Sequence, residues 1–405
     1  YKIAPRYGTM ADAEELFRVA HEKGIHVLID LVPGHTSEEH PWFLKSAEEH
    51  PDEEYADRYI WTDSAFTRGD GMPFIGGEKP RDATYIINFF KCQPALNFGY
   101  RDIHDPSWQQ PIDAPGPLAN REAMKDIMRH WLNLGCDGFR VDMADSLVKN
   151  DHGTKEATVK VWQDMAGAIH EEYPDAALVS EWNNPQQALA GGFDMDFFLN
   201  WDGNGYSNLL RDYKLDGKKL VSDNSYFKAE SDRDMHCFLD DYMPKYEQTK
   251  DLGLYCLITG NHDVKRPTVN LNDSERKIAY AFLLTMPGVP FIYYGDEIAT
   301  EGYHDPFNRA TFKEEGFADS YSDFFKAVNN TAVTETTLEV LQAFVVIHIC
   351  TIEDTNKPVC FDVERAIVCA ENFECVAVFF HFNLDKFRFI NDNRWKFLQF
   401  CKYCT

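Results

Sequence analysis

The stretch MKDIMRHWLNLGCDGFRVD, residues 124–142, indicates most clearly which fold this chain adopts. Its first half has the apolar spacing of an amphipathic helix, with Met124, Ile127, Met128, Trp131 and Leu132 on one face. Gly135 ends this predicted helix, and a short apolar strand follows at residues 138–141. Asp142 comes directly after the strand. The stretch therefore predicts a helix that returns to a buried strand, with an acid at the end of that strand.

The same alternation of helix and strand recurs along the chain. Further helices are predicted at residues 9–24, 155–172 and 274–286, and further strands at 25–29, 176–180, 193–199, 254–259 and 289–294. The strands are short, nearly continuous apolar runs, which are typical of a parallel sheet covered on both faces. The chain is therefore predicted to be an α/β protein.

Polar residues follow most of the predicted strands, and this favours one of the two common parallel folds. They are Asp30 to His35, Asp142, Glu181, His262 with Asp263, and Asp296 with Glu297. Side chains at the C-terminal ends of many strands build the active site of a (β/α)8 barrel. A doubly wound sheet would instead use a glycine-rich phosphate loop, and the sequence contains no GxGxxG. We predict a (β/α)8 TIM barrel with about six of its eight βα units present.

The predicted domains follow from where the alternation stops. Residues 36–116 are too many for an ordinary βα loop, so we predict an irregular inserted subdomain after the third strand of the barrel. Residues 1–35 and 117–300 form the two parts of the barrel. The tail, residues 301–405, is atypical, because no glycine follows Gly316 and six of the ten cysteines follow residue 349. It is either a small β or mixed domain with a strand at Cys375–Phe382, or a mis-spliced or frame-shifted translation.

The composition limits the partners of the chain. Forty basic and 66 acidic residues give a net charge of -26, which argues against nucleic acid or an anionic membrane and is compatible with a neutral sugar. The most apolar stretch, residues 278–295, is broken by Pro287 and Pro290 and is not expected to span a membrane. Cys401 and Cys404 lack a second cysteine pair, so no zinc or redox role is expected.

The first residue of the chain is Tyr1 rather than Met, so we expect an N-terminal piece to be missing. Any signal peptide would lie in that piece. The compartment therefore stays open, with the cytoplasm slightly favoured.

Arg140 and Asp142 carry the first chemical signal. Residues i and i+2 of a strand project from the same face, so this cation and this carboxylate are predicted to face one space. The cation would keep the carboxylate ionised, as a carboxylate nucleophile requires. A purely structural ion pair would have the same pattern, and it is the later acidic motifs that favour chemistry.

Two further acids complete a set that suits glycoside cleavage through an oxocarbenium-like transition state. Glu181 follows the apolar strand that ends near Val179 and precedes Trp182, where partial desolvation would raise its pKa. A raised pKa suits a general acid/base. Asp263 would be a third carboxylate that fixes ring hydroxyls.

The neighbouring polar residues have a binding interpretation and a structural one. His35 and His262 are predicted to donate hydrogen bonds to sugar hydroxyls, although histidines in such loops more often have a structural role. Trp182 is either a sugar platform or a packing wall. Asp30 is assigned the structural role of accepting hydrogen bonds from backbone amides.

Taken in order, these residues resemble the α-amylase superfamily, glycoside hydrolase family 13, whose members are (β/α)8 enzymes. The resemblance covers about residues 1–300 and rests on six motifs: Asp30–His35, Gln93–Asn97, Gly138–Asp142, Glu181, Asn261–Asp263 and Phe291–Glu297. It implies α-glucosidic substrates and retention of anomeric configuration. By this resemblance Asp142 is the nucleophile, Glu181 the acid/base and Asp263 the third acid, in a site enclosed between the barrel and the inserted domain.

The sequence also departs from the family pattern. Gly34 stands where the family usually has an Asn that is often a calcium ligand, so no cofactor is expected and a calcium site is not supported. Ala95 stands where the family's motif in the inserted domain usually has an Asp. The residues after Asp263, up to Arg266, differ from the family's more common sequence, but Arg266 is still expected to reach the substrate. The first two strands of the family's barrel would precede residue 1.

Four functions follow from these residues. The first is a retaining hydrolase that cleaves α-glucosidic bonds in maltooligosaccharides or related α-glucans. The motifs are most similar to the oligosaccharide-acting branch, the oligo-1,6-glucosidases, α-glucosidases and trehalose-synthase-like proteins. Met143 occupies a position associated with linkage preference but does not choose between α-1,4 and α-1,6. The second is transglycosylation or isomerisation on the same residues, since only the acceptor differs.

The other two functions need different chemistry. A metal-dependent barrel hydrolase would use Asp30, His35, His262 and Asp263 as ligands, but no close-spaced His-x-His pair or bridging Lys is evident. An inactive truncated member, or a non-catalytic binding or chaperone subunit, is the fourth. Such subunits usually lack one of the acids, and here all three are present.

Overall fold

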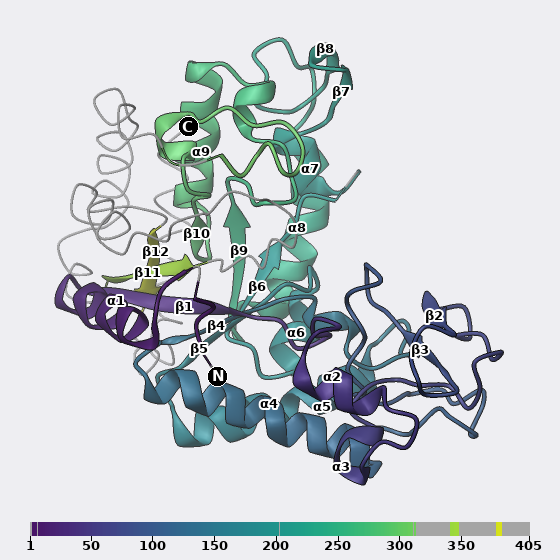
Figure 1. The fold of residues 1–405 in the computed structure, drawn as a ribbon. Coiled ribbons are helices and arrows are strands. Elements are labelled where there is room, and N and C mark those ends of the chain that lie inside the picture. The colour runs from purple at the N-terminus through teal and green to yellow at the C-terminus, as the bar shows by residue number, and fades with distance from the viewer. Residues whose placement is uncertain are drawn as a thin grey trace. The chain divides into compact units, whose positions relative to one another are not determined.

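We analysed a computed structural model, which describes residues 2–5, 7–201, 203–310, 312, 341–347 and 378–382 (Figure 1). The described chain divides into two compact units. The first unit comprises Ile29–Trp182 and Gln187–Asp194. The second comprises Lys2–Leu28, Asn183–Gln186 and the residues from Met195 onward.

The sheet of the first unit is parallel, as the sequence predicts. Its strands lie in the order β5 (Ala177–Ser180), β4 (Gly138–Val141) and the end of β1 (Ile25–Leu31). β4 and β5 pair in register from Gly138 opposite Ala177 to Val141 opposite Ser180. Every residue of β4 and β5 is buried, which explains why both strands are mainly apolar, with Arg140 and Ser180 as the polar exceptions.

Gly138 allows β4 to approach β5 closely. Its φ is +149°, and a Cβ placed on it would lie 2.0 Å from the carbonyl oxygen of Ala177. No other residue type fits that space without moving the backbone.

Two long helices of the first unit, α4 (Pro115–Asn133) and α5 (Glu156–Glu172), lie side by side (Figure 1). The buried stripe of α5 is apolar and contains Val161, Trp162, Met165, Ala166 and Ile169, whereas α4 buries polar residues as well as Met124 and Met128. Ion pairs join the two helices, from Lys125 Nζ to Asp164 Oδ1 at 2.9 Å and from Arg129 Nη2 to Glu172 Oε1 at 2.6 Å.

The segment between β1 and α4 contains short elements only. They are α2 (Pro41–Ser46), α3 (Glu53–Ala56) and an antiparallel pair of strands, β2 (Phe74–Gly76) and β3 (Thr84–Ile86). An aromatic cluster of its own fills its interior, with the rings of Phe43 and Trp61 stacked 5.7 Å apart and both near Tyr85.

The second unit has its own parallel strands, in the order β10 (Pro290–Phe291), β9 (Leu254–Ile258) and β6 (Met195–Phe198). The predicted strands at these places are confirmed, although β10 is shorter than expected. α1 (Met10–Glu22) begins at Thr9, whose hydroxyl and Asp12 form a capping box. α9 (Asp273–Thr285) begins with a second capping box, between Asn272 and Glu275.

Several elements of the chain were not predicted from the sequence. In the second unit they are α7 (Gly205–Leu210), α8 (His236–Thr249) and the antiparallel pair β7 (Tyr213–Asp216) and β8 (Lys219–Asp223). α6 (Pro185–Ala190) follows Trp182. An aromatic stack joins β6, α8 and β9, with Phe198, Tyr242 and Tyr255 as its members.

In the tail the structure describes one antiparallel pair, β11 (Leu341–Ile347) and β12 (Val378–Phe382), with Leu341 opposite Phe382. The strand predicted at Cys375–Phe382 is confirmed over the part that β12 covers, and the Cys401–Cys404 pair lies outside the described residues. In the described part of the chain, no helix is both long and apolar enough to cross a membrane.

Candidate active site

Arg140 brings three carboxylates together at the ends of β1, β4 and β5. Its Nη1 lies 2.8 Å from Asp142 Oδ1 and 2.9 Å from Asp30 Oδ1, and its Nη2 lies 2.7 Å from Glu181 Oε1. Burial alone would lower the pKa of the Arg140 guanidinium, but the three carboxylates outweigh it and raise the pKa above its ordinary range. The expectation that Arg140 and Asp142 face one space agrees with this geometry.

Asp142 is the most accessible of the three acids. Its side chain is 21% exposed, against 8% for Glu181 and 6% for Asp30. Its backbone amide donates to the carbonyl oxygen of Leu31 at 2.8 Å, which ties the end of β4 to the end of β1. Asp142 therefore combines a fixed backbone with a carboxylate that a ligand can reach.

Glu181 is buried, as expected, but its carboxylate does not face apolar groups. Oε1 contacts the Arg140 guanidinium, and Oε2 accepts a hydrogen bond from the backbone amide of Met143 at 3.1 Å. The pairing of β4 with β5 brings Arg140 across to this side chain, so its surroundings are not only apolar. The raised pKa of Glu181 stays a prediction.

Met143, which follows Asp142, adopts the left-handed conformation with φ 42° and ψ 45°. This turn starts a short 3-10 helix, Ala144–Ser146, and directs the Met143 amide toward Glu181. The next amide, of Ala144, donates to the carbonyl oxygen of Glu181 at 3.2 Å. Two consecutive amides thus hold Glu181 by its side chain and its backbone.

Asp30 contacts the guanidinium of Arg140. This contact supports the structural role predicted for Asp30, and the predicted hydrogen bonds from backbone amides stay a prediction. Asp30 is the third of the acids that share this cation.

His35 lies on the loop after β1. Its Nδ1 is 3.2 Å from Nδ2 of Asn88, and its ring meets the ring of Phe89 edge to face with centroids 6.1 Å apart. His35 also forms an isolated bridge with Ala95, which belongs to the motif Gln93–Asn97. The first and second motifs of the sequence are therefore joined in the structure.

Trp182 is 4% exposed. Its Nε1 donates to Gln187 Oε1 at 3.1 Å, and its ring meets Phe193 edge to face at 6.3 Å. This placement favours the packing wall over the sugar platform.

His262 and Asp263 lie in the second unit, on the loop after β9. Asn261 Oδ1 accepts hydrogen bonds from the amides of Asp263 and Val264 at 2.9 and 3.1 Å, which shapes the loop. His262 Nε2 lies 3.4 Å from Asp263 Oδ2, and the Asp263 side chain is 57% exposed. The loop thus presents an accessible carboxylate beside an imidazole.

Asn308 and Arg309, which the sequence did not single out, support the same loop. Asn308 Nδ2 donates to the carbonyl oxygens of His262 and Val264 at 2.6 and 2.9 Å. Arg309 Nη2 lies 4.0 Å from Asp263 Oδ1, and Arg309 also pairs with Asp305. No sequence signal pointed to either residue, because their partners lie more than forty positions earlier in the chain.

Arg266 is 1% exposed. Its guanidinium contacts Asp296 Oδ1 and the carbonyl oxygen of Tyr294, both at 2.8 Å, and lies over the ring of Tyr293. These contacts favour a structural role over the predicted substrate contact. The neighbouring Glu297 is fully buried, and burial raises its pKa to about 8.

The residues around Gly34 do not fit a calcium ion. A Cβ at Gly34 would lie 2.9 Å from Nδ2 of Asn88, so the side chain that the family usually has there would displace Asn88. Lys149 Nζ lies 3.3 Å from Oδ1 of Asn88 and 3.0 Å from the carbonyl oxygen of Ser146. An ammonium group already contacts these oxygens, and it would repel a divalent cation.

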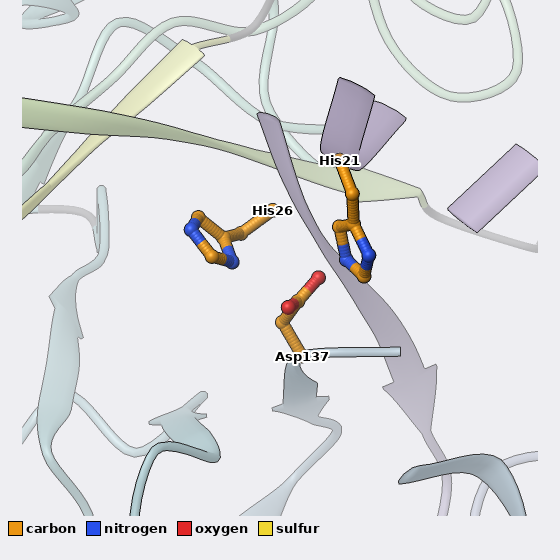
Figure 2. A group of neighbouring side chains, drawn as sticks. All are labelled: His21, His26 and Asp137. Atoms are coloured by element: carbon orange, nitrogen blue, oxygen red, sulfur yellow. The ribbon is translucent and has the colours of Figure 1, made fainter. Parts of the chain in front are cut away.

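Two other histidines lie together in the second unit. His21 near the end of α1 and His26 in β1 have ring centroids 5.9 Å apart (Figure 2). Asp137, which Figure 2 also draws, belongs to the first unit. Two imidazoles provide fewer ligands than a structural or catalytic zinc site requires.

Comparison with known proteins extends these findings. A family model described as "Alpha amylase, catalytic domain" matches residues 1–342. The chain is 30% identical over 319 residues to Alpha-amylase 3 of Dictyoglomus thermophilum, which covers 77% of this chain and 55% of that protein. It is 29% identical over 335 residues to the trehalose synthase/amylase TreS of Mycobacterium tuberculosis, covering 74% of this chain and 52% of that protein.

The fold is shared with solved structures as well. Amy13B of Eubacterium rectale superposes with a TM-score of 0.56 at 22% identity, covering 76% of this chain and 56% of that chain. Together with the parallel strands of both units, this likeness confirms the predicted (β/α)8 fold class. The chain spans about half the length of the curated relatives it matches.

Proposed function

The chain belongs to the α-amylase catalytic-domain family, and from this membership we propose that it is a retaining glycoside hydrolase that cleaves α-glucosidic bonds in maltooligosaccharides or related α-glucans. The observation that carries the proposal is the contact of one guanidinium, that of Arg140, with both Asp142 and Glu181. A nucleophile and an acid/base at adjacent strand ends are what a double displacement at an anomeric carbon requires.

Asp142 is the proposed nucleophile. Its Oδ1 is held by Arg140, and the other oxygen is the one proposed to attack the anomeric carbon. The bond from that carbon to the leaving oxygen breaks as the bond to Asp142 forms, and a glycosyl ester remains on the enzyme.

Glu181 is the proposed acid/base. Its carboxyl group lies at the end of the strand beside that of Asp142, and both carboxyl groups contact the guanidinium of Arg140. Protonated Glu181 gives its proton to the leaving oxygen in the first step. In the second step it removes a proton from water, whose oxygen attacks the anomeric carbon and releases Asp142.

The remaining residues are assigned to substrate binding. Asp263 is the proposed third acid, which binds ring hydroxyls, and its exposed carboxylate is suited to that task. His35 and His262 are proposed donors to hydroxyl groups. Trp182 and Arg266 remain predictions with less support, because both are buried and bonded within the protein.

We also infer that the activity needs no calcium, because Lys149 provides a positive charge beside Asn88. A chelator distinguishes this proposal from a metal-dependent hydrolase. Activity that survives the chelator supports the metal-independent mechanism. Activity that is lost with the chelator and restored by a metal ion contradicts that mechanism.

The test of the proposed function compares two substrates. The full chain is expected to hydrolyse maltotriose and α-glucosyl fluoride, and to release the α anomer first. Asp142→Asn is expected to lose both activities. Glu181→Gln is expected to lose maltotriose hydrolysis but to release a burst of fluoride, because that leaving group needs no proton, and then to stall at the glycosyl ester, whose hydrolysis needs Glu181 as a base. Glu122→Gln on the exposed face of α4 is a matched control that should leave both unchanged.

One observation favours a second candidate. TreS, whose printed name includes both activities, is among the relatives, so transfer of the glycosyl group to a sugar is an alternative fate of the same intermediate. Incubation with maltose distinguishes the two, because a hydrolase gives glucose alone and an isomerising enzyme also gives a non-reducing disaccharide. Absence of turnover on maltose, maltotriose and α-glucosyl fluoride would contradict both candidate functions, hydrolysis and glycosyl transfer.

A further inference from the structure

Asn88 connects three segments of the first unit. Its Nδ2 lies 3.0 Å from the carbonyl oxygen of Gly34 and 3.2 Å from Nδ1 of His35, and its Oδ1 lies 3.3 Å from Nζ of Lys149. Gly34 and His35 follow β1, Asn88 follows β3, and Lys149 follows the 3-10 helix after β4. One amide side chain therefore bonds to both the histidine and the lysine.

The orientation of the Asn88 amide is determined from both sides. An ammonium group can only donate hydrogen bonds, so the amide atom that faces Lys149 is the oxygen. A carbonyl oxygen can only accept, so the amide atom that faces Gly34 is the nitrogen. The two requirements agree, and they place the NH2 group of Asn88 toward His35.

This orientation decides which nitrogen of His35 carries the proton. Because Asn88 Nδ2 donates, Nδ1 of His35 accepts, and the neutral ring then holds its proton on Nε2. We propose that Lys149 and Asn88 are positioning residues that fix His35 as the Nε2–H tautomer, which presents a hydrogen-bond donor to a hydroxyl group of the bound sugar. The last step, donation to the sugar, rests on the proposed function.

Lys149 is itself fixed by the segment that carries the proposed nucleophile. Its Nζ donates to the carbonyl oxygen of Ser146, and the Ser146 hydroxyl donates to the carbonyl oxygen of Met143 at 2.9 Å. Its backbone amide donates to Gly99, and its carbonyl oxygen accepts from Arg101, both at 3.0 Å. The ammonium group is therefore held by its backbone and its side chain, and is suited to orient Asn88.

Gly34 leaves the space that Asn88 needs. A Cβ at Gly34 would approach Nδ2 to 2.9 Å, which is closer than such contacts allow. The departure from the family at this position is thus explained by Asn88. Gly34→Ala is expected to push the amide away from His35 and to weaken the selection of the tautomer.

The test measures the tautomer directly, without substrate. In the full chain labelled with 15N-histidine, the two ring nitrogens of His35 are assigned by subtracting the spectrum of His35→Gln. We expect a protonated Nε2 and an unprotonated Nδ1. In Asn88→Asp the carboxylate can only accept, so we expect the proton to appear on Nδ1. A native His35 that is protonated on Nδ1 alone would overturn the proposal.

Matched variants separate this role from a merely structural one. Lys149→Met removes the charge that orients Asn88 and is expected to mix the two tautomers. Lys125→Met and Asn120→Asp alter a buried lysine and a buried asparagine elsewhere in the first unit, and should leave the His35 signals unchanged. Altered His35 signals in both control variants, with none in Lys149→Met, would contradict the assignment.

Kinetics then test the step that involves substrate. If the protein hydrolyses maltotriose, Asn88→Asp is expected to raise KM about tenfold or more, because a donor at His35 is replaced by an acceptor. Its tautomer shift is expected even if no substrate is turned over. An inactive protein with the expected tautomers would therefore count against the proposed function and not against the positioning of His35.

Discussion

The backbone amide of Met143 donates to Oε2 of Glu181 from a residue in the left-handed region of backbone space. A side chain with a branched Cβ rarely adopts that conformation, whereas glycine adopts it freely. The turn after β4 is therefore strained at the residue that holds the proposed acid/base.

Met143→Val is expected to move this amide away from Glu181 and to lower kcat about tenfold, the value of one hydrogen bond to a charged group. Met143→Gly keeps the turn and should retain most of the activity. Steady-state kinetics on maltotriose measure both. Lys155 also has a left-handed backbone conformation, so Lys155→Val is the control for backbone strain without a change at Glu181. It should destabilise the fold but leave kcat unchanged. Equal activity of Met143→Val and Met143→Gly would contradict the prediction.

Arg140→Met is expected to cost about 3–5 kcal/mol of unfolding free energy, because three carboxylates lose the cation that they share. Arg140→Lys should restore little of this free energy. An ammonium group has a single nitrogen and cannot contact three acids as the two guanidinium nitrogens of Arg140 do. Urea unfolding measures the change. Arg129→Met breaks two more exposed ion pairs, one with Asp126 within α4 and one with Glu172 of α5, and should cost less than about 1 kcal/mol. Similar losses of unfolding free energy in Arg140→Met and Arg129→Met would contradict the prediction that the three carboxylates depend on the shared cation.

Lys149 is expected to make the stability of the protein depend on pH in the alkaline range. Burial lowers its pKa from 10.5 to about 8, so between these values the unfolded chain binds more protons than the folded one. The free energy of unfolding should therefore rise with pH across this window, relative to Lys149→Met, by up to about 3 kcal/mol. Urea unfolding of both proteins between pH 7 and about 11 measures this difference. A difference in unfolding free energy between the two proteins that does not change with pH would contradict the lowered pKa of Lys149.

His170 is expected to make the stability of the protein depend on pH in the direction opposite to that of Lys149. A hydrogen bond to Asp194 raises its pKa above 6.5, so its contribution to stability is complete below that value and is lost as pH rises through the folded pKa. His170→Gln should therefore destabilise the protein at pH 5 and have little effect well above the folded pKa. Thermal unfolding at several pH values is the measurement.

Calcium chelation is expected to leave both the melting temperature and the activity unchanged. Lys149 already bonds to the oxygens of Asn88 and Ser146, and Gly34 supplies no side-chain ligand. Calorimetry with EDTA and with added calcium measures this. A rise in melting temperature on addition of calcium alone would indicate a site that these residues do not predict.

The strands and the main helices were predictable because each has a local pattern. The apolar runs gave β1, β4, β5, β6 and β9, and the caps at Thr9 and Asn272 mark where α1 and α9 begin. α8 was missed because Pro244 lies inside it, and proline usually ends a helix. The pair β7 and β8 was missed although a two-residue turn that begins with glycine, here Gly217-Lys218, is a common hairpin turn.

The candidate site was predictable only where its partners are close in sequence. Arg140 and Asp142 share a face of one strand, so their contact follows from spacing. The contact of Arg140 with Glu181 depends on the register between two strands, and that of Lys149 with Asn88 joins residues 61 positions apart. Neither leaves a local signal, and this is why the surroundings of Glu181 were predicted as apolar.

The absence of a side chain at position 138 sets the geometry of the reactive groups at the opposite end of the strand. With only a hydrogen atom between the two backbones, β4 and β5 keep one register from Gly138 opposite Ala177 to Val141 opposite Ser180, immediately before Asp142 and Glu181. Even a methyl group at position 138 would wedge the two strands apart. The placement of the proposed nucleophile beside the proposed acid/base thus depends on a residue at the far end of the strand.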